Sequence, residues 1–208
     1  MGYCYPMTAD LMPLITAIVD NDVAAFDARL AAAPALARAV VAVGATRQNA
    51  GDFFLPMIGR YLMTGDTALH IAAAAYRPGM VAALLAAGAD PGARNRRGAE
   101  PLHAVASGQP GSPAWNPEAQ TRVIALLIAA GANPNARDKS DTTPLHKAVR
   151  TRCAAAVEAL MSGGADTALA TRRGSTPARL AELTTGRGGS GSAEAKAEQA
   201  AILKQLGC

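Results

Sequence analysis

The chain has 208 residues, which suits one domain or two small ones. Half of the residues are hydrophobic, but 50 are alanine and only eight are aromatic. This composition excludes a sandwich or barrel with a thick aromatic core and favours short helices that pack closely through small residues. The formal net charge is +4, and sixteen of the twenty cations are arginine, a bias typical of GC-rich bacterial genomes. No basic stripe interleaved with aromatic residues is visible, which argues against a nucleic-acid partner.

The ends and the cysteines indicate a cytoplasmic protein. The N-terminal residues MGYCYPMTAD lack the basic and apolar regions of a signal peptide, and no stretch reaches the length of a membrane-spanning helix. Cys4, Cys153 and Cys208 are widely spaced, so we expect reduced thiols rather than disulfides or a zinc site.

Residues 10–39 predict a first pair of helices. Apolar residues recur there at helical spacing, and Asn21-Asp22 separates two stripes. The first stripe is Leu11, Leu14, Ile15, Ile18 and Val19, and the second is Val23, Phe26 and Leu30.

Residues 40–63 follow as an insertion without helical periodicity. They contain Phe53, Phe54 and Tyr61, and Tyr76 comes soon after. The three insertion aromatics either fold back to cap the next unit or, with Tyr76, stay exposed as anchors for a partner.

A repeat begins near residue 64. The segments Thr67-Ala-Leu-His70, Glu100-Pro-Leu-His103 and Thr143-Pro-Leu-His146 align, and Thr176-Pro-Ala-Arg179 is a degenerate copy. A second marker, Gly-Ala-Asp or Gly-Ala-Asn, starts at residues 88, 131 and 164. Each marker recurs after 33 residues, except for one step of 43 across the second unit. The longer step locates a ten-residue insertion in that unit.

The residues between the markers predict two helices per unit. Thr143 and Thr67 suit a helix N-cap, whereas Glu100 replaces this threonine in the second unit. The second helices have apolar residues at i, i+3 and i+4, and the glycine of the second marker suits the left-handed end of a helix. These stripes are Val81, Leu84 and Leu85; Val123, Leu126 and Leu127; and Val157, Leu160 and Met161.

This pattern resembles the ankyrin repeat. The resemblance implies an all-α solenoid of about five helix pairs, with a hairpin-like finger between repeats and a concave face that binds protein partners. We place a cap unit at 10–39, the insertion at 40–63, and repeats at 64–97, 98–140, 141–173 and 174–208. The second repeat contains an inserted turn at 107–118, and the degenerate last repeat contains a Gly-rich one at 184–192, before a final helix from about Ala193 to Leu206.

The three histidines do not predict a metal or catalytic site. Each lies one repeat, or about 10 Å, from the next, whereas zinc ligands must converge on one ion. The resemblance implies instead that each histidine bonds to nearby backbone. We therefore expect no enzyme, no metal and no cofactor.

The fingers carry one cation per repeat at a constant position. Arg96, Lys139 and Arg172 each lie eight residues after the glycine of the second marker. In a stack they would form a basic ridge that favours an acidic protein segment. The predicted partner-binding residues, for a protein expected to be monomeric, are Arg94, Arg96, Arg97, Arg137, Lys139, Lys147, Arg150, Arg172, Arg173 and Trp115. Solvated fingertip charge, without a partner, is the simpler interpretation of the same cations.

A second hypothesis places a small anionic ligand, or a minor catalytic site, on the edge formed by the inserted turns. It would use Trp115, Cys153 and Arg187, together with Arg152 and the Gly-rich residues 186–192. The inserted turns motivate it, because a plain scaffold does not need them.

Overall fold

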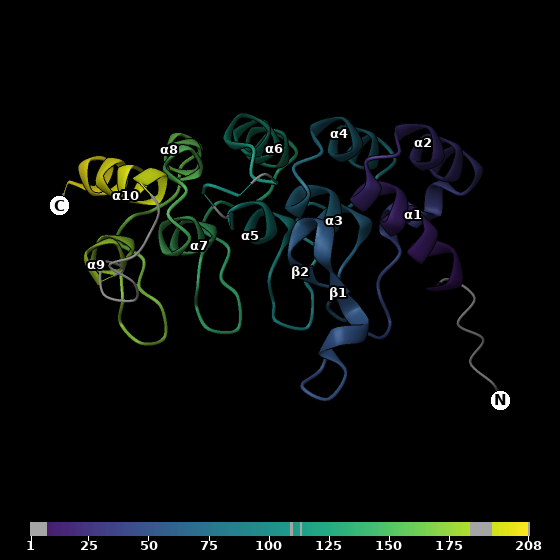
Figure 1. Cartoon of the computed structure of the whole chain (residues 1–208), viewed down its shortest axis with the longest axis horizontal. Helices are drawn as coiled ribbons and strands as arrows, with labels where there is room; N and C mark the ends of the chain where they lie inside the picture. The colour runs from purple at the N-terminus through teal and green to yellow at the C-terminus, as the bar shows by residue number, and fades with distance from the viewer. Residues whose placement is uncertain (1–7, 109, 113, 184–192, 208) are drawn as a thin grey trace.

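The computed structural model describes residues 8–108, 110–112, 114–183 and 193–207. Its helices stand in two rows, with α1, α3, α5, α7 and α9 in one row and their even-numbered partners in the other (Figure 1). The predicted all-α solenoid is confirmed. The helices are α1 Thr8–Asp20, α2 Val23–Ala32, α3 Ala68–Ala74, α4 Pro78–Ala86, α5 Pro101–Val105, α6 Pro117–Ala129, α7 Pro144–Arg150, α8 Ala154–Ser162, α9 Pro177–Leu183 and α10 Ala193–Leu206.

The first helix pair follows the predicted stripes with one exception. All five residues of the first stripe are buried on α1, and Asn21 ends that helix with a φ of 58°. Asp22 then caps α2 by accepting the N–H of Ala25 at 2.9 Å. Val23 is wrong as a core residue: it is the first residue of α2 after this cap, and 54% of its surface is exposed.

The 40–63 insertion forms a folded hairpin. A 3₁₀ turn at Pro34–Arg38 precedes it, and two more, at Ala50–Phe53 and Pro56–Ile58, lie within it. Strands β1 (Phe54–Leu55) and β2 (Arg60–Tyr61) pair antiparallel. Within the insertion, the Ala45 N–H donates to the carbonyl of Leu62 at 2.8 Å. The insertion is joined to the first repeat because the Val41 N–H donates to the carbonyl of Asp66 at 2.8 Å.

The insertion aromatics divide between the two predicted roles. Phe53 is half-buried and packs against the core. Phe54 and Tyr61 are 40% and 43% exposed, and their rings lie 4.9 Å apart on the hairpin surface. Tyr76 is wrong as an exposed anchor, since it is buried and its hydroxyl donates to the carbonyl of Ser107 at 2.6 Å.

Helix caps and helix-ending glycines lie at the positions of the two sequence markers. Thr67 and Thr143 cap α3 and α7, and Asn116 caps α6 by accepting the N–H of Ala119 at 2.9 Å. The glycines that follow α4, α6 and α8 have positive φ values, as the left-handed helix end requires.

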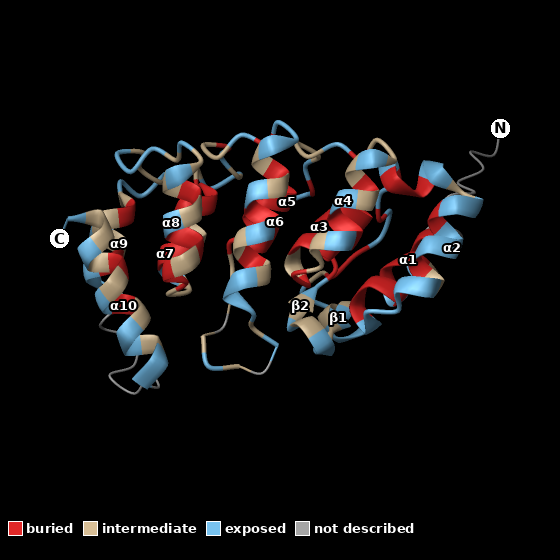
Figure 2. Cartoon of the chain, turned by 90° about the horizontal axis from the view of Figure 1, so that it is seen from above, coloured by how far each residue is buried: buried red, intermediate tan, exposed pale blue. Residues whose placement is uncertain are grey.

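One continuous core joins the helix pairs from α1 to α10. Buried surfaces face neighbouring helices and exposed residues lie on the outside (Figure 2). Ile202 of α10 is fully buried, whereas Leu203 and Leu206 are half-buried against the same core. Within the described parts of the chain, no helix combines the length and apolarity needed to cross a bilayer.

Candidate partner-binding face

Three fingers, the loops that connect α4 to α5, α6 to α7 and α8 to α9, lie side by side below the helices (Figure 1). They span residues 88–100, 131–143 and 164–176. Each is bonded to the segment before it through the backbone of its predicted cation. Each N–H donates to a backbone carbonyl: that of Arg96 to Thr64 at 2.8 Å, that of Lys139 to Arg97 at 2.9 Å, and that of Arg172 to Ser140 at 3.1 Å. This shared bond fixes the three cations at equivalent positions along the stack.

The cations of the fingers are on the surface. Arg96 and Lys139 are exposed and make no ion pair with a described residue. The same is true of the neighbouring Arg97 and Arg173. Arg172 is also exposed, with Asp141 at 3.6 Å. A partner could therefore reach Arg96, Lys139 and Arg172.

Two other predicted residues, Arg94 and Arg137, have contacts within the protein. Arg94 lies 3.0 Å from the carboxylate of Glu100, and an Arg137 Nη1 group donates to the Ala170 carbonyl at 3.5 Å. Both remain exposed. Arg150, at the end of α7, is exposed as well.

Lys147 is less available than the sequence suggests. Its ammonium group lies 3.4 Å from Asp138, and the two side chains are only 19% and 8% exposed. Burial lowers the pKa of Lys147, and the nearby Arg150 acts in the same direction. For Asp138, burial pushes the pKa upward, but the N–H groups of Ser140 and Thr142 and the charge of Lys147 outweigh it, so the pKa is lowered. This pair holds the finger against α7.

Trp115 does not protrude into solvent. Its ring is half-buried against the core, and its Nε1–H donates to the Gln120 carboxamide at 3.1 Å. Gly108 lies against both this ring and the Cys153 sulfur, leaving no room for a Cβ atom. Trp115 therefore belongs to a packed loop, with part of its ring exposed.

Cys153 is fully buried, and burial raises the pKa of its thiol. It cannot contact a ligand on the inserted-turn edge as the second hypothesis required, because no part of it reaches the surface. Arg187 and the Gly-rich residues 186–192 lie outside the described residues.

The repeat histidines join each repeat to the next. In each case Nδ1 accepts the N–H of the cap residue, and Nε2 bonds to a carbonyl that opens the following repeat at 3.0 Å. The carbonyls belong to Ala99, Thr142 and Ser175. The expected backbone role is confirmed, and it extends across the repeat boundary. Glu100 still donates its N–H to His103, so α5 begins normally without the threonine.

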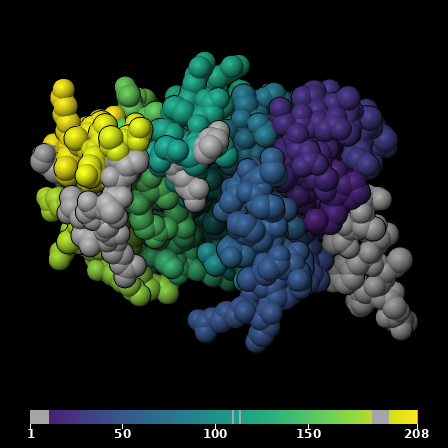
Figure 3. All heavy atoms as spheres, in the orientation of Figure 1, coloured from purple at the N-terminus to yellow at the C-terminus, as the bar shows by residue number. Residues whose placement is uncertain are grey.

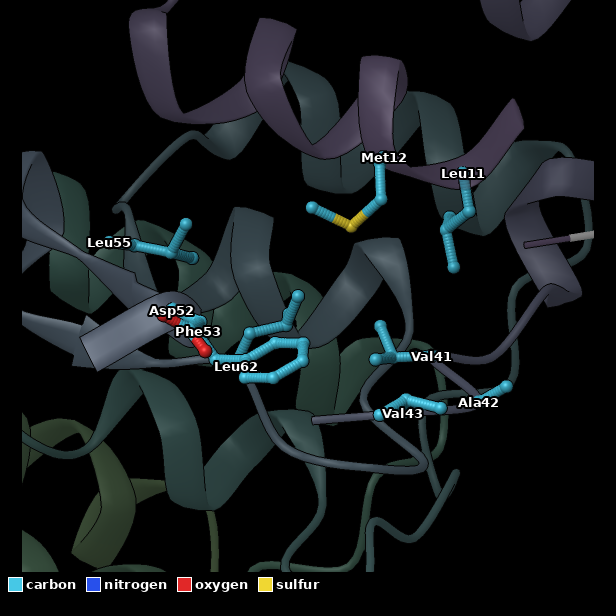
Figure 4. Close-up of a pocket in the computed structure, with 9 residues that line it drawn as sticks. All are labelled: Leu11, Met12, Val41, Ala42, Val43, Asp52, Phe53, Leu55 and Leu62. Carbon is cyan, nitrogen blue, oxygen red and sulfur yellow. The ribbon is translucent and has the colours of Figure 1, made fainter. Parts of the chain in front are cut away.

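The 40–63 hairpin borders two cavities that the sequence did not predict. The first, of about 300 Å³, lies between α1 and the hairpin, where Met12, Val43 and Phe53 face one another (Figure 4). The second, of about 680 Å³, lies between the hairpin and the α5–α6 loop. The sequence lacked a signal for them because residues 40–63 have no period that relates them to a distant loop.

Comparison with known families matches the repeats found in the sequence. The ankyrin repeat model matches residues 64–96 and 97–139, and a model for many copies of the repeat matches residues 127–181. Together these matches run over residues 64–181, which is more than half of the chain. The comparison with curated proteins gives no match. The chain belongs to the ankyrin repeat family.

Proposed function

We propose that this protein binds an acidic segment of a protein partner along its fingers. Ankyrin repeats are generally protein–protein interaction modules, and stacked repeats provide extended binding surfaces. The observation that supports this particular face is the alignment of Arg96, Lys139 and Arg172, each bonded through its N–H to the preceding segment. The cations recur at roughly 10 Å, the spacing of packed helices.

A ridge of this kind acts mainly on the rate of association. Separate exposed cations attract an acidic segment from a distance of about one Debye length, roughly 8 to 10 Å in physiological salt. The exposed Arg97, Arg150 and Arg173 add to the same field. The proposed activity is binding without catalysis, by a monomer in the cytoplasm.

The test is capture from a lysate of the source cell, read by mass spectrometry. The baits are the wild type, a finger variant (Arg96→Glu, Lys139→Glu, Arg172→Glu) and a control variant (Arg29→Glu, Arg122→Glu, Lys204→Glu). The control residues are exposed on the even-numbered helices, and both variants lower the formal net charge by six. A protein captured by the wild type and the control but lost from the finger variant supports the proposal. Equal capture by all three baits would show that the partner does not bind through the finger cations.

A further inference from the structure

A groove lies on the edge of the stack where the two helices of each repeat are joined. The hairpin residues Pro56–Arg60 form one wall, and the α5–α6 loop with Trp115 forms the other. The turn between α3 and α4, at Ala74–Arg77, lines the space between them. The groove holds about 680 Å³, which is within the range of small-molecule sites. Figure 3 shows the hairpin, in blue, beside the teal loop on this face.

The groove is positively charged. Arg60 and Arg77 line it, and no Asp or Glu is among its described lining residues. Nη2 of Arg60 lies 3.4 Å from Asp66, whereas Arg77 makes no ion pair with any described residue. The Nε atoms of both arginines are buried without a hydrogen-bond partner among the described residues. Neither guanidinium is therefore fully satisfied by hydrogen bonds within the described protein, and an unpaired buried donor costs free energy.

The rest of the groove combines apolar and polar side chains and is already held in place. Trp115 is fixed by its bond to Gln120, with Met57 and Ile58 on the opposite wall. The Tyr76 hydroxyl ties the α3–α4 turn to the loop, and the N–H of Gly108 donates to Thr151 Oγ1 at 3.3 Å. A ligand would therefore enter a formed site, which reduces the ordering cost of binding.

We propose that this groove binds a small ligand in which a carboxylate or phosphate group is attached to an aromatic or similar apolar body. The planar guanidinium of Arg77 offers paired donors to the oxyanion, a geometry that carboxylates and phosphates share. The Trp115 ring and the apolar side chains of the hairpin contact the body. The site differs from the anion site expected from the sequence, since Arg60 and Arg77 replace Arg187 and Cys153. It does not depend on the finger face.

The experiment uses the emission of Trp115, which is the only tryptophan of the chain and lines the groove. The full chain is titrated with phenyl phosphate, benzoate, phenol and inorganic phosphate. A saturable change with either aryl oxyanion, at a Kd of about 1 mM or below, is expected, and the two Kd values show which oxyanion is preferred. Phenol and inorganic phosphate should bind more weakly. No saturable change with either aryl oxyanion, or equal binding of phenol, would overturn the proposal.

A pair of variants ties the response to the guanidinium. Arg77→Gln should weaken binding of the responding aryl oxyanion by about tenfold or more, because a charge-assisted hydrogen bond is lost. Arg122→Gln, at an exposed position of α6 outside the groove, should bind like the wild type. Thermal unfolding shows whether each variant is folded, and Arg77→Lys, which keeps the charge but loses the paired donors, should bind with intermediate strength. Wild-type affinity in folded Arg77→Gln would overturn the assignment. The finger variant should bind the aryl oxyanion like the wild type, because its substitutions lie outside the groove. The titration therefore tests the groove even if the fingers bind no partner.

Discussion

Single residues fix the spacing of the repeats. His70, His103 and His146 are buried, and each uses one ring nitrogen within its own repeat and the other on the next. Only a neutral ring can accept at Nδ1 and donate at Nε2 at the same time. Burial accordingly lowers the pKa of all three, and that of His103 falls to about 4. The junctions between repeats are therefore sensitive to acid.

The pH dependence of unfolding tests this role of His103. Burial lowers the pKa of His103 to about 4 in the folded protein, below the ordinary histidine value of 6.5, so the unfolded chain binds the proton first as the pH falls. The stabilisation is complete above pH 6.5 and is lost as the pH falls towards 4. The free energy of unfolding that is lost between these pH values because of His103 is about 3 kcal/mol. Urea unfolding at several pH values should show that His103→Gln loses less stability on acidification than the wild type. Equal pH dependence in the two proteins would contradict a neutral buried His103.

Gly108 controls the position of Trp115. A Cβ atom at Gly108 would lie 2.7 Å from the Cys153 sulfur and 2.9 Å from the Trp115 ring. Gly108→Ala should therefore displace the ring, shift its emission and reduce stability by about 1–3 kcal/mol. Gly79→Ala is the matched control, because nothing lies within 4 Å of its Cβ position in α4. It should leave stability unchanged or raise it by up to about 1 kcal/mol. An unchanged emission spectrum in Gly108→Ala would refute this packing.

Sequence alone could place these residues but not their partners. The motif located the three histidines and the finger cations, since each has a fixed position in the period. The burial of Tyr76 and the Lys147–Asp138 pair depend on how a loop meets a neighbouring element. No local pattern encodes such contacts. The same reason explains why Arg60 and Arg77, from two separate segments, were not recognised as one site.

Elements of this fold are completed by their neighbours. Cys153 precedes α8 without offering a side-chain cap, and the carboxylate of Glu198 on α10 accepts the N–H of Ala154 at 2.6 Å instead. A negative charge at this end of a helix also interacts favourably with its dipole. The last helix therefore supports the repeat before it.

Removal of this carboxylate should weaken the C-terminal end of the stack. Glu198→Ala is expected to cost about 1 kcal/mol, as the loss of an N-cap does, and to increase hydrogen exchange in the first turn of α8. Glu158→Ala, at an exposed position on α8 itself, is the control and should have little effect on stability or exchange. Equal exchange in the two variants would show that Glu198 does not cap α8.

The helices were predictable from the sequence, whereas the hairpin was not. The apolar stripes of α1, α6 and α8 follow a period that one segment carries by itself. The 40–63 insertion has strands of only two residues, and Gly44 packs directly on the backbone of residues 62–64. Its shape depends on an internal bond from Ala45 to Leu62 and on a bond from Val41 to Asp66 of the first repeat, and both join residues that are far apart along the chain.

The whole molecule presents two separate charged surfaces. The fingers lie below the row of odd-numbered helices (Figure 1), and the groove with Arg60 and Arg77 lies on the edge where the helices of a pair are joined. The stack gives the fingers their regular spacing, because each one bonds to the segment before it. A partner that follows the fingers would thus leave the groove open.

The measurement that tests the central claim most directly is the association rate of the captured partner at increasing salt concentration, for the wild type and the finger variant. If the aligned cations attract an acidic segment, the wild-type rate should be high at low salt and fall by about tenfold or more as the charges are screened. The finger variant should associate slowly and with little dependence on salt. Rates that are the same for both proteins at low salt would contradict a binding face built from the fingers.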